Sequence, residues 1–306
     1  MEVNFILVHY HRTNFPAYIY TCIEQIRETN PKANIYLGYF SSCKVDYKRL
    51  KAAGCYLQDI GKYLWTPMHY LFKLKNRGIF TTERFFVIYE IMKHNHLRNV
   101  IHVENDCMVY INIERIIAIL QDNYDLGIVR ENDEKCIASF VYIKETRWLK
   151  KLCSFLVKQK NVNDMYALSD FGYRNKLHYL PVVSNAYAKQ EEMSYGPSEA
   201  RIQVKQKEVY CENVEKFGCV FDGAAYGVYA GGLDVRFGLG DTRGYINDLD
   251  SCYSLTKCNM VWEKIDGINR PFYLYGTEKI PIANLHIYSK ELDKFRARYP
   301  YEPGDR

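Results

Sequence analysis

The stretch NVIHVENDCMVY, residues 99–110, contains the feature from which the rest of the chain is best interpreted. Val100, Ile101 and Val103 are apolar and typical of an interior strand, and no apolar residue occurs at 104–106, which are Glu, Asn and Asp. Two carboxylates at the carboxyl end of a strand occupy the place where an open α/β sheet binds its ligand. They could hold a divalent cation against a diphosphate, and the alternative is a solvated acidic turn.

The segments around this stretch predict a parallel α/β sheet. Strands are expected at 5–8, 35–39 and 55–59, with a helix between the first two, and this order is typical of a Rossmann-like start. A further helix is expected from about residue 82 to 96, whereas residues 65–81 resist assignment. After the acidic turn, strands are expected at 126–129, 137–143 and 280–287. Neither G-x-G-x-x-G nor a P-loop motif occurs, so no dinucleotide fingerprint supports this start.

Composition narrows the possible partners and the compartment. Lys and Arg exceed Asp and Glu by only 41 to 36, without a basic block in the sequence, so nucleic acid is not an expected partner. The sequence contains no run of eighteen apolar residues, so we expect no membrane span. The apolar amino terminus has no basic lead, which indicates a first strand and a cytoplasmic location. Ten cysteines without a C-x-x-C pair indicate reduced packing thiols.

His286, in the predicted strand near the carboxyl end, could add an imidazole ligand to a cation held by carboxylates. Mixed oxygen and nitrogen ligation suits Mn(II) better than a pure oxygen cage does. A lone histidine is more often a hydrogen-bonded structural residue, and this alternative stays open.

Two other charged residues are candidates for the chemistry. Asp222 follows a strand-like segment at 219–221 and begins a helix of small residues, DGAAYGVYAGG. Its carboxylate could accept the proton of an attacking sugar hydroxyl, or it could cap the helix. Arg84, on the helix before the acidic turn, could bond a phosphate or a nucleobase, or form an ordinary surface pair.

Five segments together resemble GT-A type glycosyltransferases, and more narrowly nucleotide-sugar transferase-like proteins of large DNA viruses and microbes. The resemblance extends over most of the chain and is weakest between about residues 161 and 206. The segments that carry it are FILVHY (5–10), TTERFFVIYEIM (81–92), VIHVENDCMVY (100–110), FDGAAYGVYAGGLD (221–234) and NLHIYSKEL (284–292).

The resemblance implies a three-layer α/β/α fold and a DxD-type motif that binds manganese, or magnesium, against the phosphates of a UDP- or GDP-sugar. Glu104-Asn105-Asp106 would be that motif, with Asp106 the surest metal ligand. The chain departs from the usual pattern by having Glu in the first position, so Glu104 would contact the ribose, or the metal indirectly. His286 matches a metal-ligating histidine near the carboxyl end.

The resemblance also implies a division of labour along one domain, residues 1–306. Residues 1–160 would bind the nucleotide sugar, with Val8, His9 and Tyr10 lining the base and ribose pocket. Residues 161–306 would bind the acceptor and supply the metal-ligating strand. The expected reaction is hexosyl or pentosyl transfer to a hydroxyl of a glycan or glycoprotein, in the host cytoplasm if the protein is viral.

Two alternatives remain open at the level of sequence. A nucleotidylyltransferase shares the sheet and the metal carboxylate, but it would normally show a glycine-rich triphosphate loop after the first strand. The segment HYHRTNFP, residues 9–16, contains no glycine. The second alternative is a non-catalytic sugar-binding module with a vestigial site.

Overall fold

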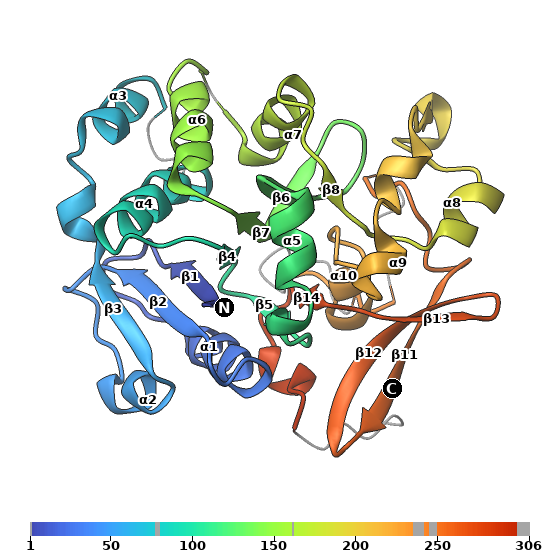
Figure 1. The fold of residues 1–306 in the computed structure, drawn as a ribbon, viewed down its shortest axis with the longest axis horizontal. Coiled ribbons are helices and arrows are strands. Elements are labelled where there is room, and N and C mark those ends of the chain that lie inside the picture. The colour runs from blue at the N-terminus through green and yellow to red at the C-terminus, as the bar shows by residue number, and fades with distance from the viewer. Residues whose placement is uncertain (1, 77–79, 161, 235–241, 245–249, 299–306) are drawn as a thin grey trace.

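A seven-stranded sheet forms the centre of the molecule (Figure 1). In the computed structural model, residues 2–76, 80–160, 162–234, 242–244 and 250–298 are described. The strand order is β3-β2-β1-β4-β7-β6-β8. The bounds are β1 Asn4–Val8, β2 Asn34–Tyr39, β3 Cys55–Asp59, β4 Val100–Val103, β6 Leu126–Arg130, β7 Cys136–Ile143 and β8 Tyr179–Leu180.

The predicted α/β class with a mostly parallel sheet is confirmed. Strand β1 pairs in parallel with both β2 and β4, β2 with β3, and β6 with β8, whereas β7 runs antiparallel to β4 and β6. The carboxyl ends of β1, β4 and β6 therefore lie at one edge of the sheet. The acidic turn follows β4 at this edge.

Helices cover both faces of the sheet, as the three-layer prediction requires (Figure 1). Successive residues of β1 enter two different hydrophobic clusters because side chains alternate along a strand. Phe5 and Leu7 belong to the cluster that includes α1 and α5, whereas Ile6 and Val8 belong to the cluster that includes α4, α6 and α7. These helices are α1 Ala17–Thr29, α5 Ile117–Asn123, α4 Phe80–His94, α6 Thr146–Leu156 and α7 Asp164–Arg174.

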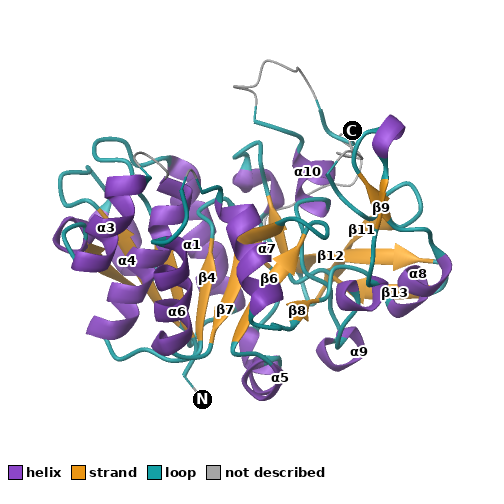
Figure 2. Ribbon diagram, turned by 90° about the horizontal axis from the view of Figure 1, so that it is seen from above, coloured by secondary structure: helices purple, strands orange, loops and turns teal. Residues whose placement is uncertain are grey.

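The remaining elements extend the molecule away from the sheet. An antiparallel ribbon, β11 to β13, lies at the opposite end of the molecule from α3 and α4 (Figure 2). The bounds are α2 Tyr47–Ala52, α3 Pro67–Lys75, α8 Asn185–Gln190, α9 Val214–Phe217, α10 Tyr226–Gly231, β9 Ser194–Tyr195, β10 Ile202–Gln203, β11 Asn259–Ile265, β12 Ile268–Tyr275 and β13 Glu278–Pro281.

A short strand pair connects the end of the chain to the acidic turn. Strand β5, Cys107–Val109, pairs antiparallel with β14, Asn284–His286, and His286 is opposite Cys107. The predicted strand at 280–287 is thus divided between β13 and β14. The strand predicted at 219–221 is wrong, because these residues make one isolated bridge, between Val220 and Ile282.

Two expectations from composition can be compared with the structure. All ten cysteines are free thiols, and nine of them are buried, in agreement with a packing role. Among the described residues, we find no helix with the length and apolar character needed to cross a bilayer.

Candidate active site

The acidic turn and His286, which were predicted separately as parts of a metal site, converge beyond the end of β4. Ligand atoms of Glu104, Asp106 and His286 all lie within 4.8 Å of one another. His286 Nε2 is 3.2 Å from Asp106 Oδ1 and 3.3 Å from Glu104 Oε2. Asp106 and His286 are buried, and Glu104 is nearly so. We call these three residues the carboxylate–histidine cluster.

The acidic turn is fixed by its own backbone and by two neighbouring strands. The Cys107 N–H donates to the Glu104 carbonyl (3.0 Å), which closes the turn, and the Glu104 N–H donates to Ser139 on β7 (3.2 Å). Asn105 Nδ2 donates to the Val8 carbonyl at the end of β1 (2.9 Å). Asn105 therefore orients the turn against the strand whose end was predicted to bind the nucleotide.

The imidazole of His286 is positioned through its backbone. The Ile287 N–H donates to the Asp106 carbonyl (2.9 Å), which extends the β14–β5 pairing up to the turn. The His286 N–H donates to Asp222 Oδ2 (2.8 Å). On the other side, helix α10 approaches so closely that a Cβ at Gly227 would lie 2.1 Å from the His286 carbonyl oxygen. Glycine is therefore required there.

Asp222 accepts four backbone hydrogen bonds and is completely buried. Besides the bond to His286, Oδ2 accepts from the N–H of Gly227 (2.8 Å), and Oδ1 accepts from those of Ala225 (2.9 Å) and Tyr226 (3.0 Å). These contacts fit the alternative in which Asp222 caps a helix, since α10 begins at Tyr226. The predicted role as a base remains a prediction, but both carboxylate oxygens are already engaged.

Two cations complete the surroundings of the cluster. Arg84 does not form the exposed surface pair considered from sequence: its guanidinium contacts Glu104 and, from Nη2, Asp164 Oδ2 (2.6 Å), and its side chain is largely buried. Lys290 Nζ contacts Asp106 Oδ2 and remains partly exposed. The two carboxylates of the cluster are thus balanced by fixed positive charge.

This charge balance sets the protonation states. Burial alone would raise the pKa of both carboxyl groups, but Arg84 and His286 beside Glu104 outweigh burial and lower its pKa. The pKa of Asp106 is lowered in the same way by His286 and Lys290. Burial opposes the protonation of His286, yet Asp106 and Glu104 outweigh it and raise its pKa. The carboxylates are therefore ionised at neutral pH, and His286 must lose a proton before it can bind a metal.

The donor set fits a divalent cation. Two ionised carboxylates and an imidazole, all presented by short backbone-fixed segments, match the mixed oxygen and nitrogen ligation of Mn(II). His286 Nδ1 has no hydrogen-bond partner among the described residues, so no second bond fixes the tautomer of the ring.

The residues predicted to line the nucleotide pocket lie beside the turn. The backbone of Val8 is joined to Asn105, as described above. His9 is buried, with Nε2 2.6 Å from the Asn14 carbonyl, and burial lowers its pKa. Tyr10 donates its hydroxyl to the Glu83 carbonyl (3.2 Å). The structure places these residues near the cluster, and their contact with a base or ribose remains a prediction.

Sequence reasoning missed Glu131. This residue directly follows β6, is 5% exposed, and its Oε2 has no hydrogen-bond partner among the described residues. Burial raises its pKa to about 7, and the charges of Asp222 and His286 are among those that act on it. The signal was available, because a polar residue after a strand at the same sheet edge is the pattern that singled out the acidic turn.

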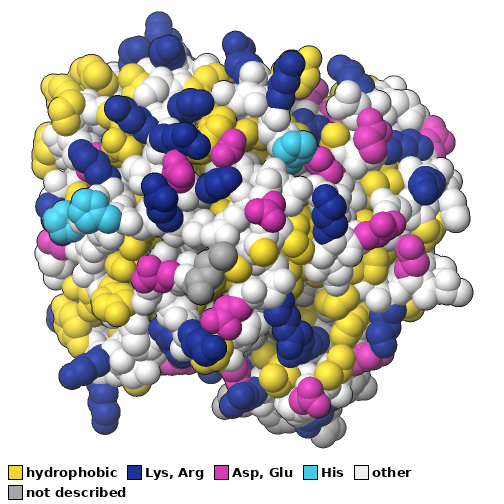
Figure 3. All heavy atoms as spheres, in the orientation of Figure 1, with side chains coloured by type: hydrophobic (Ala, Val, Ile, Leu, Met, Phe, Trp, Pro, Cys, Tyr) yellow, Lys and Arg dark blue, Asp and Glu magenta, His cyan; other side chains and the backbone are white. Residues whose placement is uncertain are grey.

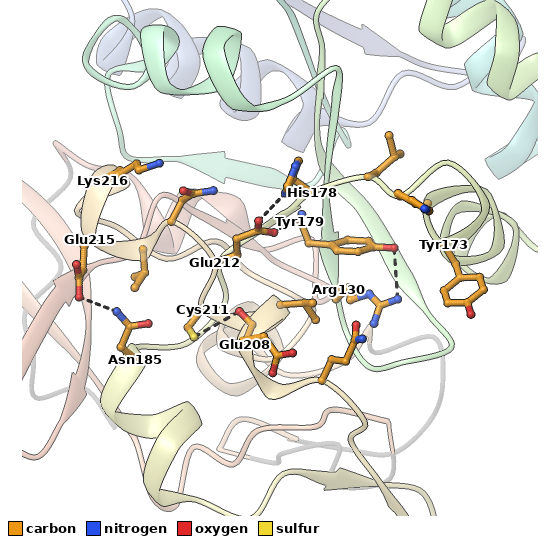
Figure 4. A pocket seen from close by; sticks show the side chains of 17 residues that line it. Arg130, Tyr173, His178, Tyr179, Asn185, Glu208, Cys211, Glu212, Glu215 and Lys216 are labelled. Atoms are coloured by element: carbon orange, nitrogen blue, oxygen red, sulfur yellow. Dashed lines mark hydrogen bonds and ion pairs between the residues drawn. The ribbon is translucent and has the colours of Figure 1, made fainter.

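A groove of about 710 Å³ opens beside α7, β8 and α9 (Figure 4). Residues of the cluster do not line it. Arg130, the residue before Glu131, forms part of its wall and donates from Nη2 to the Tyr179 hydroxyl (3.3 Å). Tyr173 lies on the rim and is 79% exposed. Most of the lining comes from residues after 161, the half predicted to bind the acceptor.

Comparison with known proteins gives similarity at the level of fold. No family model matches the chain, and no curated protein matches it either. The solved structures that resemble it include a PaToxG glycosyltransferase (TM-score 0.42, 12% identity, 57% of this chain and 69% of that one). Mouse xyloside xylosyltransferase 1 is also among them (TM-score 0.42, 10% identity, 62% of this chain and 90% of that one).

A cytidylyltransferase from Leptospira borgpetersenii resembles the chain as well (TM-score 0.35, 8% identity, 58% of this chain and 73% of that one). Both enzyme classes considered from the sequence thus occur among the similar structures. At TM-scores below 0.5 the likeness does not decide between them, so the functional argument rests on the cluster itself.

Proposed function

We propose that this protein is a metal-dependent glycosyltransferase that moves a sugar from a nucleotide-diphosphate donor to a hydroxyl of a glycan or glycoprotein. One observation carries the proposal. Glu104 and Asp106 in one turn and His286 from a distant part of the chain present their ligand atoms within 4.8 Å of one another at the carboxyl edge of a mostly parallel sheet. That edge is where such sheets bind nucleotides.

The chemistry follows from where charge develops. Departure of the nucleoside diphosphate leaves negative charge on its β-phosphate, and a bound Mn(II) or Mg(II) would supply Lewis-acid stabilisation of that charge. Asp106 and His286 would hold the cation, with Glu104 in a supporting role because Arg84 already engages it. Lys290, partly exposed beside Asp106, adds positive charge on the side that faces solvent.

The donor and the acceptor would bind to the two halves of the chain. Val8, His9 and Tyr10 are proposed to bind the base and ribose of a UDP- or GDP-sugar, since Asn105 joins the end of β1 to the acidic turn. The groove beside Tyr173 is proposed to receive the acceptor, because it is open and lies in the second half of the chain.

The acceptor hydroxyl must lose a proton as it attacks the donor sugar. Asp222 is the carboxylate proposed for this from the sequence, although its four hydrogen bonds favour a positioning role. Glu131 is a second candidate because its Oε2 has no hydrogen-bond partner in the described part of the chain, and burial raises its pKa to about 7, which suits a group that accepts a proton near neutrality.

A panel of UDP- and GDP-sugars with Mn(II) tests the proposal. We expect slow hydrolysis of one donor that requires the metal and that is lost in Asp106→Asn. Release of pyrophosphate from a nucleoside triphosphate and a sugar phosphate would instead show a nucleotidylyltransferase. Binding of a nucleoside diphosphate without any turnover would indicate the vestigial sugar-binding module.

A further inference from the structure

Exposed large hydrophobic side chains are concentrated in one short segment of the chain. Among the described residues, eleven large hydrophobic side chains are exposed, and five of them lie between residues 65 and 80. Trp65 is 78% exposed, and on α3 Leu74 is 57% exposed. The five residues are Trp65, Tyr70, Leu71, Leu74 and Phe80. Single exposed apolar residues are ordinary, but several within sixteen consecutive residues are a candidate interaction surface.

Helix α3 is nevertheless docked on its inner side. Phe72 is completely buried, with its ring centroid 4.9 Å from that of Phe86 on α4. His69 is also completely buried, and its Nε2 lies 3.0 Å from Glu83 Oε2. The helix thus has apolar side chains on both its inner and outer sides. The outward leucines are therefore additional to those that the core requires.

The same segment is basic. Between Asp59 and Glu83 the sequence contains no acidic residue, and it includes Lys62, Lys73 and Lys75. Lys62 and Lys75 are exposed, and Lys73 is partly exposed, with Nζ 3.3 Å from Glu83.

Helix α6 extends this basic surface. Residues 146–160 contain no acidic residue. The apolar side of α6 is buried, so its outer side carries the exposed cations Arg147, Lys150 and Lys151, and the exposed Lys158 follows the end of the helix.

The two helices are joined at their carboxyl ends. Lys75 Nζ donates to the Val157 carbonyl (3.1 Å), and Asn76 Nδ2 donates to the Gln159 carbonyl (3.1 Å). We call the exposed surface of residues 62–75, Phe80 and α6 the α3–α6 corner. Figure 3 shows hydrophobic and basic side chains gathered over the region that these helices occupy. The formal net charge of the whole chain is only +5, so the corner concentrates basic charge that the total does not reveal.

We propose that the α3–α6 corner binds the surface of an anionic membrane. Trp and Leu side chains partition into the boundary between headgroups and acyl chains, while Lys and Arg near the surface attract anionic lipid headgroups. Outward leucines beside a predominantly basic surface match an anionic membrane, although Arg147 pairs with Glu145 (3.0 Å) and Lys73 with Glu83 (3.3 Å). A nucleic acid would leave Leu71 and Leu74 against its phosphates.

The corner adjoins the sheet edge that carries the candidate active site. The ring of Phe80 lies 5.7 Å from that of Tyr10, centroid to centroid, and Tyr10 is two residues beyond β1. Membrane binding would therefore hold this edge close to the bilayer. If the proposed function holds, this placement favours an acceptor glycan carried on a lipid or on a membrane-anchored protein.

Vesicle flotation of the full chain tests the proposal without any nucleotide sugar, so its outcome is independent of the proposed enzyme activity. We expect binding to phosphatidylcholine vesicles that contain about 30% phosphatidylglycerol, weak binding to phosphatidylcholine alone, and release by salt. The double variant Leu71→Ser/Leu74→Ser should bind at least roughly tenfold more weakly. The matched control is Ile202→Ser, another exposed apolar residue, and it should bind like the wild type.

Circular dichroism and thermal melting would show whether each variant is folded. The double variant Lys150→Glu/Lys151→Glu is a second test that does not depend on the leucine variant, because it changes only exposed side chains. It should abolish the preference for anionic vesicles. Equal binding to both vesicle types, or unchanged binding by both double variants, would overturn the proposal. So would a dimer in size-exclusion chromatography that the leucine variant abolishes while vesicles leave the wild type unbound.

Discussion

Replacing Asp222 by asparagine separates two roles for this residue, as a base and as a support for His286. The substitution keeps the size and shape of the side chain but removes its charge and turns one acceptor oxygen into a donor NH₂ group. Each carboxylate oxygen accepts two backbone hydrogen bonds, so either orientation of the amide leaves two buried N–H groups facing a donor.

The cost can be worked out from these contacts. A buried N–H left without an acceptor costs about 1–3 kcal/mol, so two of them cost about 2–6 kcal/mol. Removing a buried charge returns part of this cost, because burial already raises the pKa of Asp222. We expect a net loss of about 3 kcal/mol in the free energy of unfolding. Metal affinity should fall by roughly ten- to a hundredfold, the usual effect of removing a group that orients a ligand.

Urea unfolding and Mn(II) titration of the folded variant measure the two effects. Gly227→Ala is a comparison variant that keeps the charge of Asp222 but disturbs the same contacts, because its Cβ would lie 2.1 Å from the His286 carbonyl oxygen and 2.7 Å from Asp222 Oδ2. Both variants should weaken Mn(II) binding. If Asp222→Asn has the same free energy of unfolding and the same Mn(II) affinity as the wild type but transfers no sugar, the positioning role is refuted and Asp222 acts on the acceptor.

Three further outcomes follow from the site and its core. His286→Ala should weaken Mn(II) binding and leave some residual affinity, and an unchanged Mn(II) titration would show that the histidine is only structural. In the wild type, Mn(II) affinity should rise with pH, because the pKa of His286 is raised and the ring must lose its proton before it can bind the metal. His102, buried with Nδ1 on the Ile6 carbonyl, has its pKa lowered by burial to about 4. The contribution of neutral His102 to the free energy of unfolding should therefore be fully present above about pH 6.5 and should fall by about 3 kcal/mol as the pH drops towards 4. His102→Gln should remove this pH dependence from the free energies measured by urea unfolding. Glu131→Gln should lower the rate of sugar transfer and remove the ionisation near pH 7 from the pH dependence of that rate, while Mn(II) binding stays intact. A full rate with an unchanged pH dependence would exclude Glu131 as the proton acceptor.

The strands near the amino terminus could be predicted because their apolar runs are short and flanked by turns. The predicted strand at 55–59 has the bounds of β3. Residues 65–81 resisted assignment for a physical reason that the structure shows. Helix α3 carries apolar side chains both inward, as Phe72, and outward, as Leu71 and Leu74, so no single periodic stripe marks it.

The ligands could be proposed from the sequence, but not how the fold holds them. Placing His286 beside Asp106 depends on the pairing of β14 with β5, a contact between distant segments that no local pattern encodes. Asp222 could be named as a candidate from the sequence, whereas its four hydrogen bonds depend on where α10 packs. Glu131 was not singled out from the sequence, because its environment depends on a remote segment whose Cys252 N–H donates to the Glu131 carbonyl (3.2 Å).

Titration of the metal-free protein with Mn(II), followed by electron paramagnetic resonance with and without a nucleoside diphosphate, tests the central claim most directly. We expect one Mn(II) site whose affinity increases when UDP or GDP is present. Asp106→Asn should lose this site while it keeps the fold, since Asp106 lies in a turn beyond β4 and outside the hydrophobic clusters. Equal Mn(II) binding by the wild type and Asp106→Asn would contradict the assignment of the carboxylate–histidine cluster as the metal site.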